Sequence, residues 1–74
     1  MTPAYGVVLF ESISSAVRAE KEAGKDGLKV KLVPVPRQLS SDCGICLRFE
    51  WPDMDQVREL LVSRDLKFDG IRRV

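Results

Sequence analysis

The order of strand-like and helix-like segments leaves few folds open to this chain of 74 residues. Hydrophobic patterns predict a strand, a helix, two strands, a second helix and a last strand. We expect these elements in the ranges 5–10, 12–23, 28–36, 45–51, 52–61 and 66–74. A right-handed first crossover leaves room for the third strand to insert antiparallel between the first two. The order therefore predicts one α+β domain over residues 1–74, a ferredoxin-like βαββαβ sandwich. Its four-stranded antiparallel sheet is expected in the order 4-1-3-2, with both helices on one face.

The strand patterns also predict where each strand lies in the sheet. The run "YGVVLF" at residues 5–10 lacks polar alternation, which is typical of a central strand buried on both faces. Residues 28–36 contain Pro34 and Pro36, which suit an edge strand because proline cannot donate to a ladder. The segment 45–51 alternates between two faces. One face carries Ile45, Leu47 and Phe49, and the other carries Cys46, Arg48 and Glu50.

Both helical segments carry an apolar stripe that is expected to face the sheet. Ser12 is a good N-cap for the first helix, and Gly24 and Gly27 supply its stop. Pro52 and Asp53 open the second helix, since proline is tolerated in a first turn. The expected stripes are Ile13, Ala16, Val17, Glu20 and Ala23 in the first helix, and Met54, Val57, Leu60 and Leu61 in the second.

Charge and residue content exclude several classes of function. Twelve basic side chains nearly balance eleven acidic ones, so the net charge of +1 gives no long-range field that would concentrate nucleic acid or anionic lipid. The longest apolar run, Val7 to Phe10, is far too short to span a bilayer, and the N-terminus lacks a signal-peptide pattern. There is no histidine, which excludes catalytic triads and mixed Cys/His zinc sites within one chain. We expect a cytoplasmic protein with no nucleic-acid or membrane partner and, since no cofactor motif is present, no cofactor.

The segment "PRQLSSDCGIC", from Pro36 to Cys46, holds both cysteines in a CxxC spacing. This spacing suggests a dithiol redox pair or half of a zinc site. Strand geometry weakens the redox interpretation, because residues three apart on a strand point to opposite faces about 10 Å apart, whereas a disulfide needs Cα atoms within about 4.4–6.8 Å. Structural zinc usually takes four protein ligands, so a metal would have to be shared between two chains. We therefore assign no metal here.

A single reactive thiol at Cys43 is the second interpretation. Neighbouring hydroxyl and backbone N–H groups can form an anion-holding concavity, and Arg37 would add a positive charge. These neighbours are Ser40, Ser41 and Gly44. The topology also brings the helix start at Ser12 to this end of the sheet, which favours the thiolate, whereas Asp42 opposes it.

A structural alternative stays open for every residue of this segment. Serine, aspartate and glycine are common turn residues, and a cysteine that enters a strand often packs as a small apolar group. Ser12 needs nothing beyond its capping role, and Arg37 can be a solvated loop charge. Cys46 is a candidate second thiol, although a structural role on the open sheet face is favoured for it.

An interaction module without enzymatic activity is the rival hypothesis. A sheet with one uncovered face exposes apolar side chains, and such patches usually mark association. The residues expected there are Val8 or Val7, Phe10, Val33, Cys46 and Phe68. A homodimer formed through this face would be one outcome.

The run "VVLFESISSAVRAEKEAGKDGLKVKLVPVPRQLSSDCGICLRF" resembles a family of small bacterial domains called putative selenium/sulfur carrier protein-like. The shared pattern is a Phe-x-Ser junction, an Ala-Glu-Lys helix, a Lys-Leu-x-Pro-x-Pro-Arg turn and a Ser-x-Cys-Gly segment. The matching residues are Phe10, Ser12, Ala19, Glu20, Lys21, Pro34, Pro36, Arg37, Ser41, Cys43 and Gly44. Members often have a small apolar residue in place of Cys46, and many have a Thr-His pair in place of Ile13 and Ser14, so no role of that histidine transfers.

The resemblance implies a carrier or binding domain rather than a true enzyme. It implies that sulfur or selenium is held on Cys43 as a persulfide or selenopersulfide. From the composition of the segment together with this match, we expect Arg37, Ser40, Ser41 and the amide of Gly44 to stabilise the anion. Donor and acceptor proteins would then be the partners of the chain.

Overall fold

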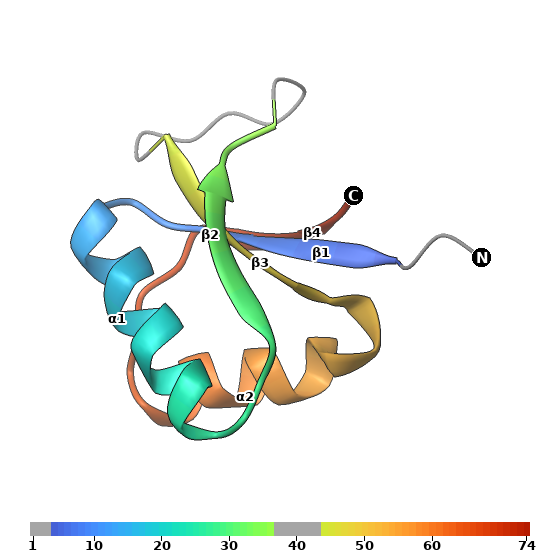
Figure 1. The fold of residues 1–74 in the computed structure, drawn as a ribbon. Coiled ribbons are helices and arrows are strands. Elements are labelled where there is room, and N and C mark those ends of the chain that lie inside the picture. Colours follow the sequence, from blue (N-terminus) through green and yellow to red (C-terminus); the bar gives the residue numbers. More distant parts are fainter. Residues whose placement is uncertain (1–3, 37–43) are drawn as a thin grey trace.

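The computed structural model describes residues 4–36 and 44–74, and within these ranges the chain forms four strands and two α-helices (Figure 1). The strands are β1 (Tyr5–Leu9), β2 (Val30–Pro34), β3 (Ile45–Glu50) and β4 (Gly70–Arg73). The helices are α1 (Ile13–Lys25) and α2 (Met54–Ser63), with a 3-10 turn, η1 (Trp51–Asp53), directly before α2. The predicted α+β class and element order are confirmed.

The strands form one antiparallel sheet in the order β2-β3-β1-β4. Read from the β4 edge, the same order is 4-1-3-2. Strand β2 lies at an edge, as its prolines predicted, and β1 lies between β3 and β4. In the register, Leu47 faces Val8 on one side and Leu32 on the other, while Cys46 faces Leu9 and Val33. Alternate residues of each strand therefore belong to opposite faces of the sheet.

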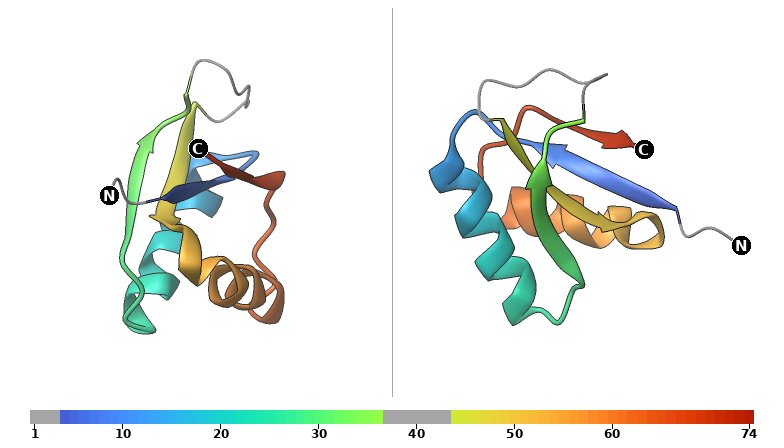
Figure 2. Two further views of the ribbon diagram at one scale, coloured as in Figure 1. Left: turned by 90° about the vertical axis from the view of Figure 1, so that its right-hand side faces the viewer. Right: turned by 45° about the horizontal axis from the view of Figure 1, so that its top comes forward.

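Both helices pack on one face of this sheet, where the main core lies (Figures 1 and 2). The fully or nearly buried residues of this core are Val8, Phe10, Ala16, Ala19, Ala23, Leu47, Phe49, Val57, Leu60, Leu61 and Leu66. The stripe predicted for α2 is confirmed at its three buried positions, Val57, Leu60 and Leu61.

The stripe predicted for α1 is partly wrong. The helix buries Ala16, Ala19 and Ala23, whereas Ile13 and Val17 are 59% and 46% exposed. Ile13 and Val17 share one side of the helix, about 100° away from the alanines at 100° per residue. The small alanine side chains allow the helix backbone to lie close to the sheet, so the larger residues stay outside.

The ends of α1 follow the predicted capping pattern with one exception. The backbone N–H of Ser15 donates to the Ser12 Oγ atom over 3.3 Å, which satisfies one of the unpaired donors of the first turn. The helix continues through Gly24 to Lys25, so Gly24 does not end it. Gly27 follows with φ of +77°, a left-handed conformation that glycine adopts at little cost.

The sheet face away from the helices carries a smaller apolar cluster. Val7, Leu9 and Cys46 are buried there, with Val33 and Val35 packed against them. Val7, rather than Val8, therefore belongs to this face. The expectation that Phe10 and Phe68 face this side is wrong, because both pack in the helix-side core. Phe10 continues the alternation that places Val8 on the helix side.

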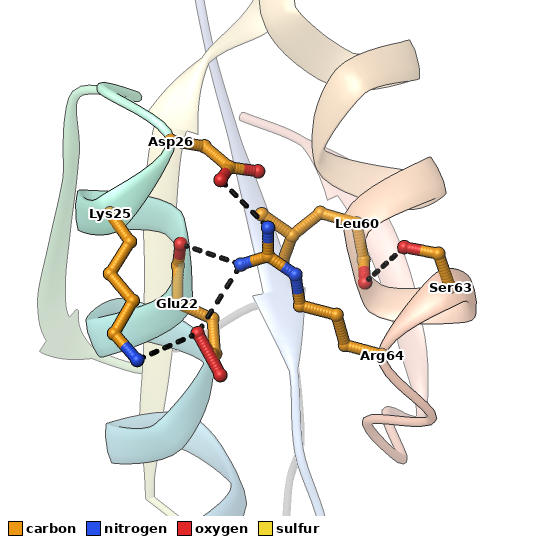
Figure 3. A network of polar contacts seen from close by, with 6 residues as sticks. All are labelled: Glu22, Lys25, Asp26, Leu60, Ser63 and Arg64. Carbon is orange, nitrogen blue, oxygen red and sulfur yellow. Dashed lines mark hydrogen bonds and ion pairs between the residues drawn. The ribbon is translucent and has the colours of Figure 1, made fainter.

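A network of polar contacts joins the end of α2 to the end of α1 (Figure 3). Arg64, the residue after α2, donates to the backbone carbonyl and the carboxylate of Glu22 over 3.0 and 3.3 Å and to the Asp26 carboxylate over 2.7 Å. Lys25 lies 3.5 Å from the same Glu22 carboxylate. The Glu22 carbonyl belongs to the last turn of α1, so Arg64 satisfies an acceptor that the helix itself leaves open.

Candidate functional site

The candidate site is at one end of the sheet, where β1 and β2 finish and β3 and β4 begin. Leu9, at the end of β1, faces Cys46 of β3 and Gly70 of β4, and Pro34, at the end of β2, faces Ile45. The chain leaves β1 at this end of the sheet and enters α1 after Ser12 (Figure 1). The two ends of the β2–β3 connection and the start of α1 therefore lie at the same end of the sheet, as the topology predicted.

A backbone hydrogen bond closes the base of the β2–β3 connection. The N–H of Val35 donates to the carbonyl of Gly44 over 3.2 Å. This bond extends the antiparallel pairing of β2 and β3 by one step beyond Pro34 and Ile45. Val35 directly follows β2 and Gly44 directly precedes β3, so this bond fixes the two points between which residues 36–43 of the sequence run.

Four of the predicted site residues lie outside the described residues. They are Arg37, Ser40, Ser41 and Cys43. Gly44, Ser12 and Cys46 lie within the described ranges. The structural roles of these three can be given, and the arrangement of the other four stays a prediction.

Gly44 is exposed and has φ of +74°. The left-handed region costs most other L-residues roughly 1–2 kcal/mol, so the backbone conformation favours glycine at position 44. An added Cβ would meet no atom within 4 Å, which shows that space does not require glycine here. Gly44 thus lies at a bend of the backbone directly before β3.

Ser12 is exposed, and its hydroxyl is engaged at the start of α1. Its Oγ accepts from the Ser15 N–H and donates to the Ser15 Oγ atom over 3.1 Å. These contacts account for serine at this position through capping. A binding role for Ser12 remains a prediction.

Cys46 is fully buried in β3, on the sheet face away from the helices. Its Sγ atom lies 3.8 Å from the carbonyl oxygen of Pro34, which it contacts as a weak donor. Leu9 and Val33 lie directly across from it on the neighbouring strands. The residue thus packs like a small apolar side chain, and solvent reagents have no access to its sulfur in the folded protein.

The sequence interpretation missed a row of basic residues that crosses three strands. Arg48 of β3 lies between Lys31 of β2 and Val7 of β1, and Arg72 of β4 lies on the other side of Val7. The guanidinium of Arg48 lies over the ring of Tyr5, 4.6 Å from its centroid. The alternation of each strand was visible in the sequence, but the register that aligns the three cations depends on strand pairing.

Residues 4–36 and 44–74 contain neither a cluster of metal ligands nor a helix that could span a membrane. No three His, Cys, Asp or Glu side chains in these ranges gather as ligands for a metal ion. No described helix has both the length and the apolar character needed to cross a membrane.

Comparison with known proteins gives one family and one curated relative. The family described as "Putative Se/S carrier protein-like" matches residues 5–73. An uncharacterised protein of Methanocaldococcus jannaschii is 32% identical over 62 residues, which are 84% of this chain and 31% of that protein. The chain thus spans about a third of the length of this relative. No solved structure matches, so the ferredoxin-like assignment stays a prediction.

Proposed function

This chain belongs to the putative Se/S carrier protein-like family, and from that membership we propose that it carries sulfur or selenium on the thiol of Cys43. The family match over residues 5–73 is the observation that carries the proposal. It includes the Cys43-Gly44 pair and both strands that flank it. The protein would act as a carrier, which receives an atom from one protein and delivers it to another.

The backbone around the connection supports this proposal. The Val35 to Gly44 hydrogen bond ties the connection to the sheet, and the left-handed Gly44 stands between Cys43 and β3. A carrier thiol must reach a donor and an acceptor in turn, and loops on a rigid scaffold are where such residues usually lie. The buried Cys46 is unsuited to that exchange, because its sulfur is enclosed by neighbouring side chains.

The proposed loading step is a thiolate exchange that balances without a redox partner. The Cys43 thiolate attacks the terminal sulfur of a donor persulfide, and a new S–S bond forms as the donor's own S–S bond breaks. The donor leaves as a thiolate, and Cys43 becomes a persulfide whose outer sulfur then releases its proton to solvent to give the persulfide anion. With a donor selenopersulfide, the terminal selenium atom is transferred in the same way. Delivery to an acceptor thiolate reverses these bond changes.

The residues around Cys43 in the sequence have the chemistry to hold such an anion. Arg37 would supply a positive charge, Ser40 and Ser41 would donate hydroxyl hydrogens, and the N–H of Gly44 would donate from the backbone. A reducing compartment such as the cytoplasm would keep Cys43 available as a thiol between transfers. The chain's own side chains suffice for this proposed cycle, which needs no cofactor.

Mass spectrometry of the intact protein tests the proposal. Treatment with a low-molecular-weight persulfide donor should add the mass of one sulfur atom to the wild-type protein and to Cys46→Ala. Cys43→Ser should gain nothing, and a reducing thiol should remove the added mass from the other two. Equal loading of Cys43→Ser, or no loading of the wild type, would contradict the proposal.

A further inference from the structure

The sheet face away from the helices carries a row of three cations beside buried apolar side chains. Lys31, Arg48 and Arg72 lie in one row across β2, β3 and β4, with Val7 of β1 between the two arginines. Val7 is only 1% exposed, whereas Lys31 and Arg72 are exposed and Arg48 is half-buried. Arginine stems can cover apolar surface while their charged ends stay in water. The row therefore exposes positive charge to solvent, with the buried apolar side chain of Val7 beneath it.

Charge is distributed unevenly between the sheet and the rest of the described chain. The four strands contain Lys31, Arg48, Arg72 and Arg73 but only one acidic residue, Glu50. Arg73 pairs with Gly6 and belongs to the helix side, whereas Glu50 pairs with Tyr5, so the strands place three cations and one carboxylate on the face away from the helices. In α1 and α2 together, four basic residues accompany four acidic ones. Because the whole chain has a net charge of only +1, the local excess on the sheet does not reflect a generally basic protein.

An apolar row lies beside the basic row on the same face. Val33, Cys46 and Leu9 are cross-strand neighbours, two residues along their strands from the cations and about 7 Å away. This row is the nearer one to the Val35 and Gly44 ends of the β2–β3 connection. Cys46 is fully buried and Leu9 is only 6% exposed, so within this row Val33 alone offers apolar surface beside the cations.

Two other occupants fit this face less well. A second copy bound face to face with the two-fold axis through this row would place the same cations against each other. Single-stranded nucleic acid is bound by aromatic stacking platforms, whereas the Tyr5 ring is already covered by Arg48. A negatively charged protein surface complements the three cations, and the half-buried Val33 beside them adds a small apolar contact.

We propose that this face of the sheet docks an acidic surface of a partner protein through Lys31, Arg48 and Arg72. The identification of that partner as the sulfur or selenium donor or acceptor rests on the function proposed above. Docking here would bring the partner against the face that is continuous with the β2–β3 connection.

NMR titration of the Cys43→Ser protein tests the docking surface without any contribution from sulfur transfer. The probe is a synthetic peptide in which glutamates and aspartates alternate with leucines. The peptide should shift the amide signals of β1, β3 and β4 around Val7, Arg48 and Arg72. Added salt should weaken its binding to the protein. The same peptide with glutamine and asparagine should bind at least about tenfold more weakly.

A pair of matched variants separates the row from overall charge. Lys31→Glu combined with Arg72→Glu should weaken peptide binding about tenfold or more, whereas Lys21→Glu combined with Arg58→Glu on the helices should change it by less than about twofold. Equal loss in both variants, absence of binding, or signal changes confined to the helices would overturn the proposal. Tighter binding of a single-stranded oligonucleotide of equal charge at this row would also overturn it. Persulfide loading of Cys43 is measured separately, so failure of docking and failure of the carrier function give different results.

Discussion

The Nη2 atom of Arg64 lies 2.7 Å from the Oδ1 atom of Asp26, so an ion pair joins the residue that follows α2, Arg64, to the residue that follows α1, Asp26. The Nη1 atom of the same guanidinium donates to the backbone carbonyl of Glu22 (Figure 3). The hydrogen bond with Asp26 raises the pKa of Arg64 above its ordinary value, with a further contribution from Glu22. A raised pKa means that the stabilisation is fully present below the ordinary pKa of arginine, and hence throughout the neutral range.

Replacement of Arg64 should loosen the junction between the helices. Arg64→Ala is expected to lower Tm slightly and to leave the carbonyl of Glu22 to solvent, because an exposed ion pair alone contributes little. Arg64→Lys keeps the charge, but a lysine has no planar fork that could bond to Glu22 and Asp26 together. This variant should therefore recover only part of the lost stability. Thermal unfolding at low and high salt measures this, with Arg58→Ala on the exposed side of α2 as the control. A Tm equal to that of Arg58→Ala at low salt would show that the network does not stabilise the fold.

Two glycine replacements should change stability in opposite directions. Gly44→Ala should destabilise by about 1–2 kcal/mol, because alanine must adopt the left-handed φ of +74°. Gly24→Ala should stabilise by about 0.4–1 kcal/mol, because Gly24 lies inside α1 with open space around it and alanine favours a helix. Urea unfolding of the two variants gives both values. Destabilisation by Gly24→Ala would mean that the helix needs glycine for a reason other than its conformation.

Gly6 makes room for two aromatic rings in the helix-side core. A Cβ at this position would lie 2.5 Å from Cζ of Phe49 and 2.7 Å from Cε3 of Trp51, whose rings stack with centroids 6.1 Å apart. Gly6→Ala should therefore cost about 1–3 kcal/mol through overpacking, or a loss in Tm of roughly 4–8 °C per kcal/mol. Gly70→Ala is the matched control, because its Cβ would meet only the flexible end of Arg72. Similar losses in the two variants would argue against the steric explanation.

The sequence predicted the parts of the fold that depend on local pattern. The element order, the edge position of β2 and the cap at Ser12 all follow from periodicity, proline chemistry and side-chain hydrogen bonding. The buried side of α1 was predicted correctly at Ala16 and Ala23 but wrongly at Val17, because Val17 is more hydrophobic than Ala19 whereas close packing against the sheet selected the smaller residue.

The candidate site was less predictable because it depends on contacts between distant segments. The sequence predicted that Cys46 lies in a strand and on the sheet face away from the helices. It did not predict how completely Leu9 and Val33 bury this side chain. The row of Lys31, Arg48 and Arg72 was hidden because the strands that carry it are far apart in the sequence. Strand register, and not residue type, creates this row.

The burial of Cys46 predicts that the two cysteines of the chain react at very different rates. Cys46 is fully buried, so iodoacetamide should reach it only after local or global opening, at least about a thousandfold more slowly than in urea. Under the carrier proposal, Cys43 should be alkylated in the native protein, at a pH below that at which an ordinary cysteine reacts. Peptide mapping after timed alkylation assigns each rate, and Cys46→Ala provides a protein in which only Cys43 can react. Alkylation of Cys46 in the native protein as fast as in urea would contradict its enclosure beside Leu9, and a Cys43 that reacts only in urea would remove the chemical basis of the carrier proposal.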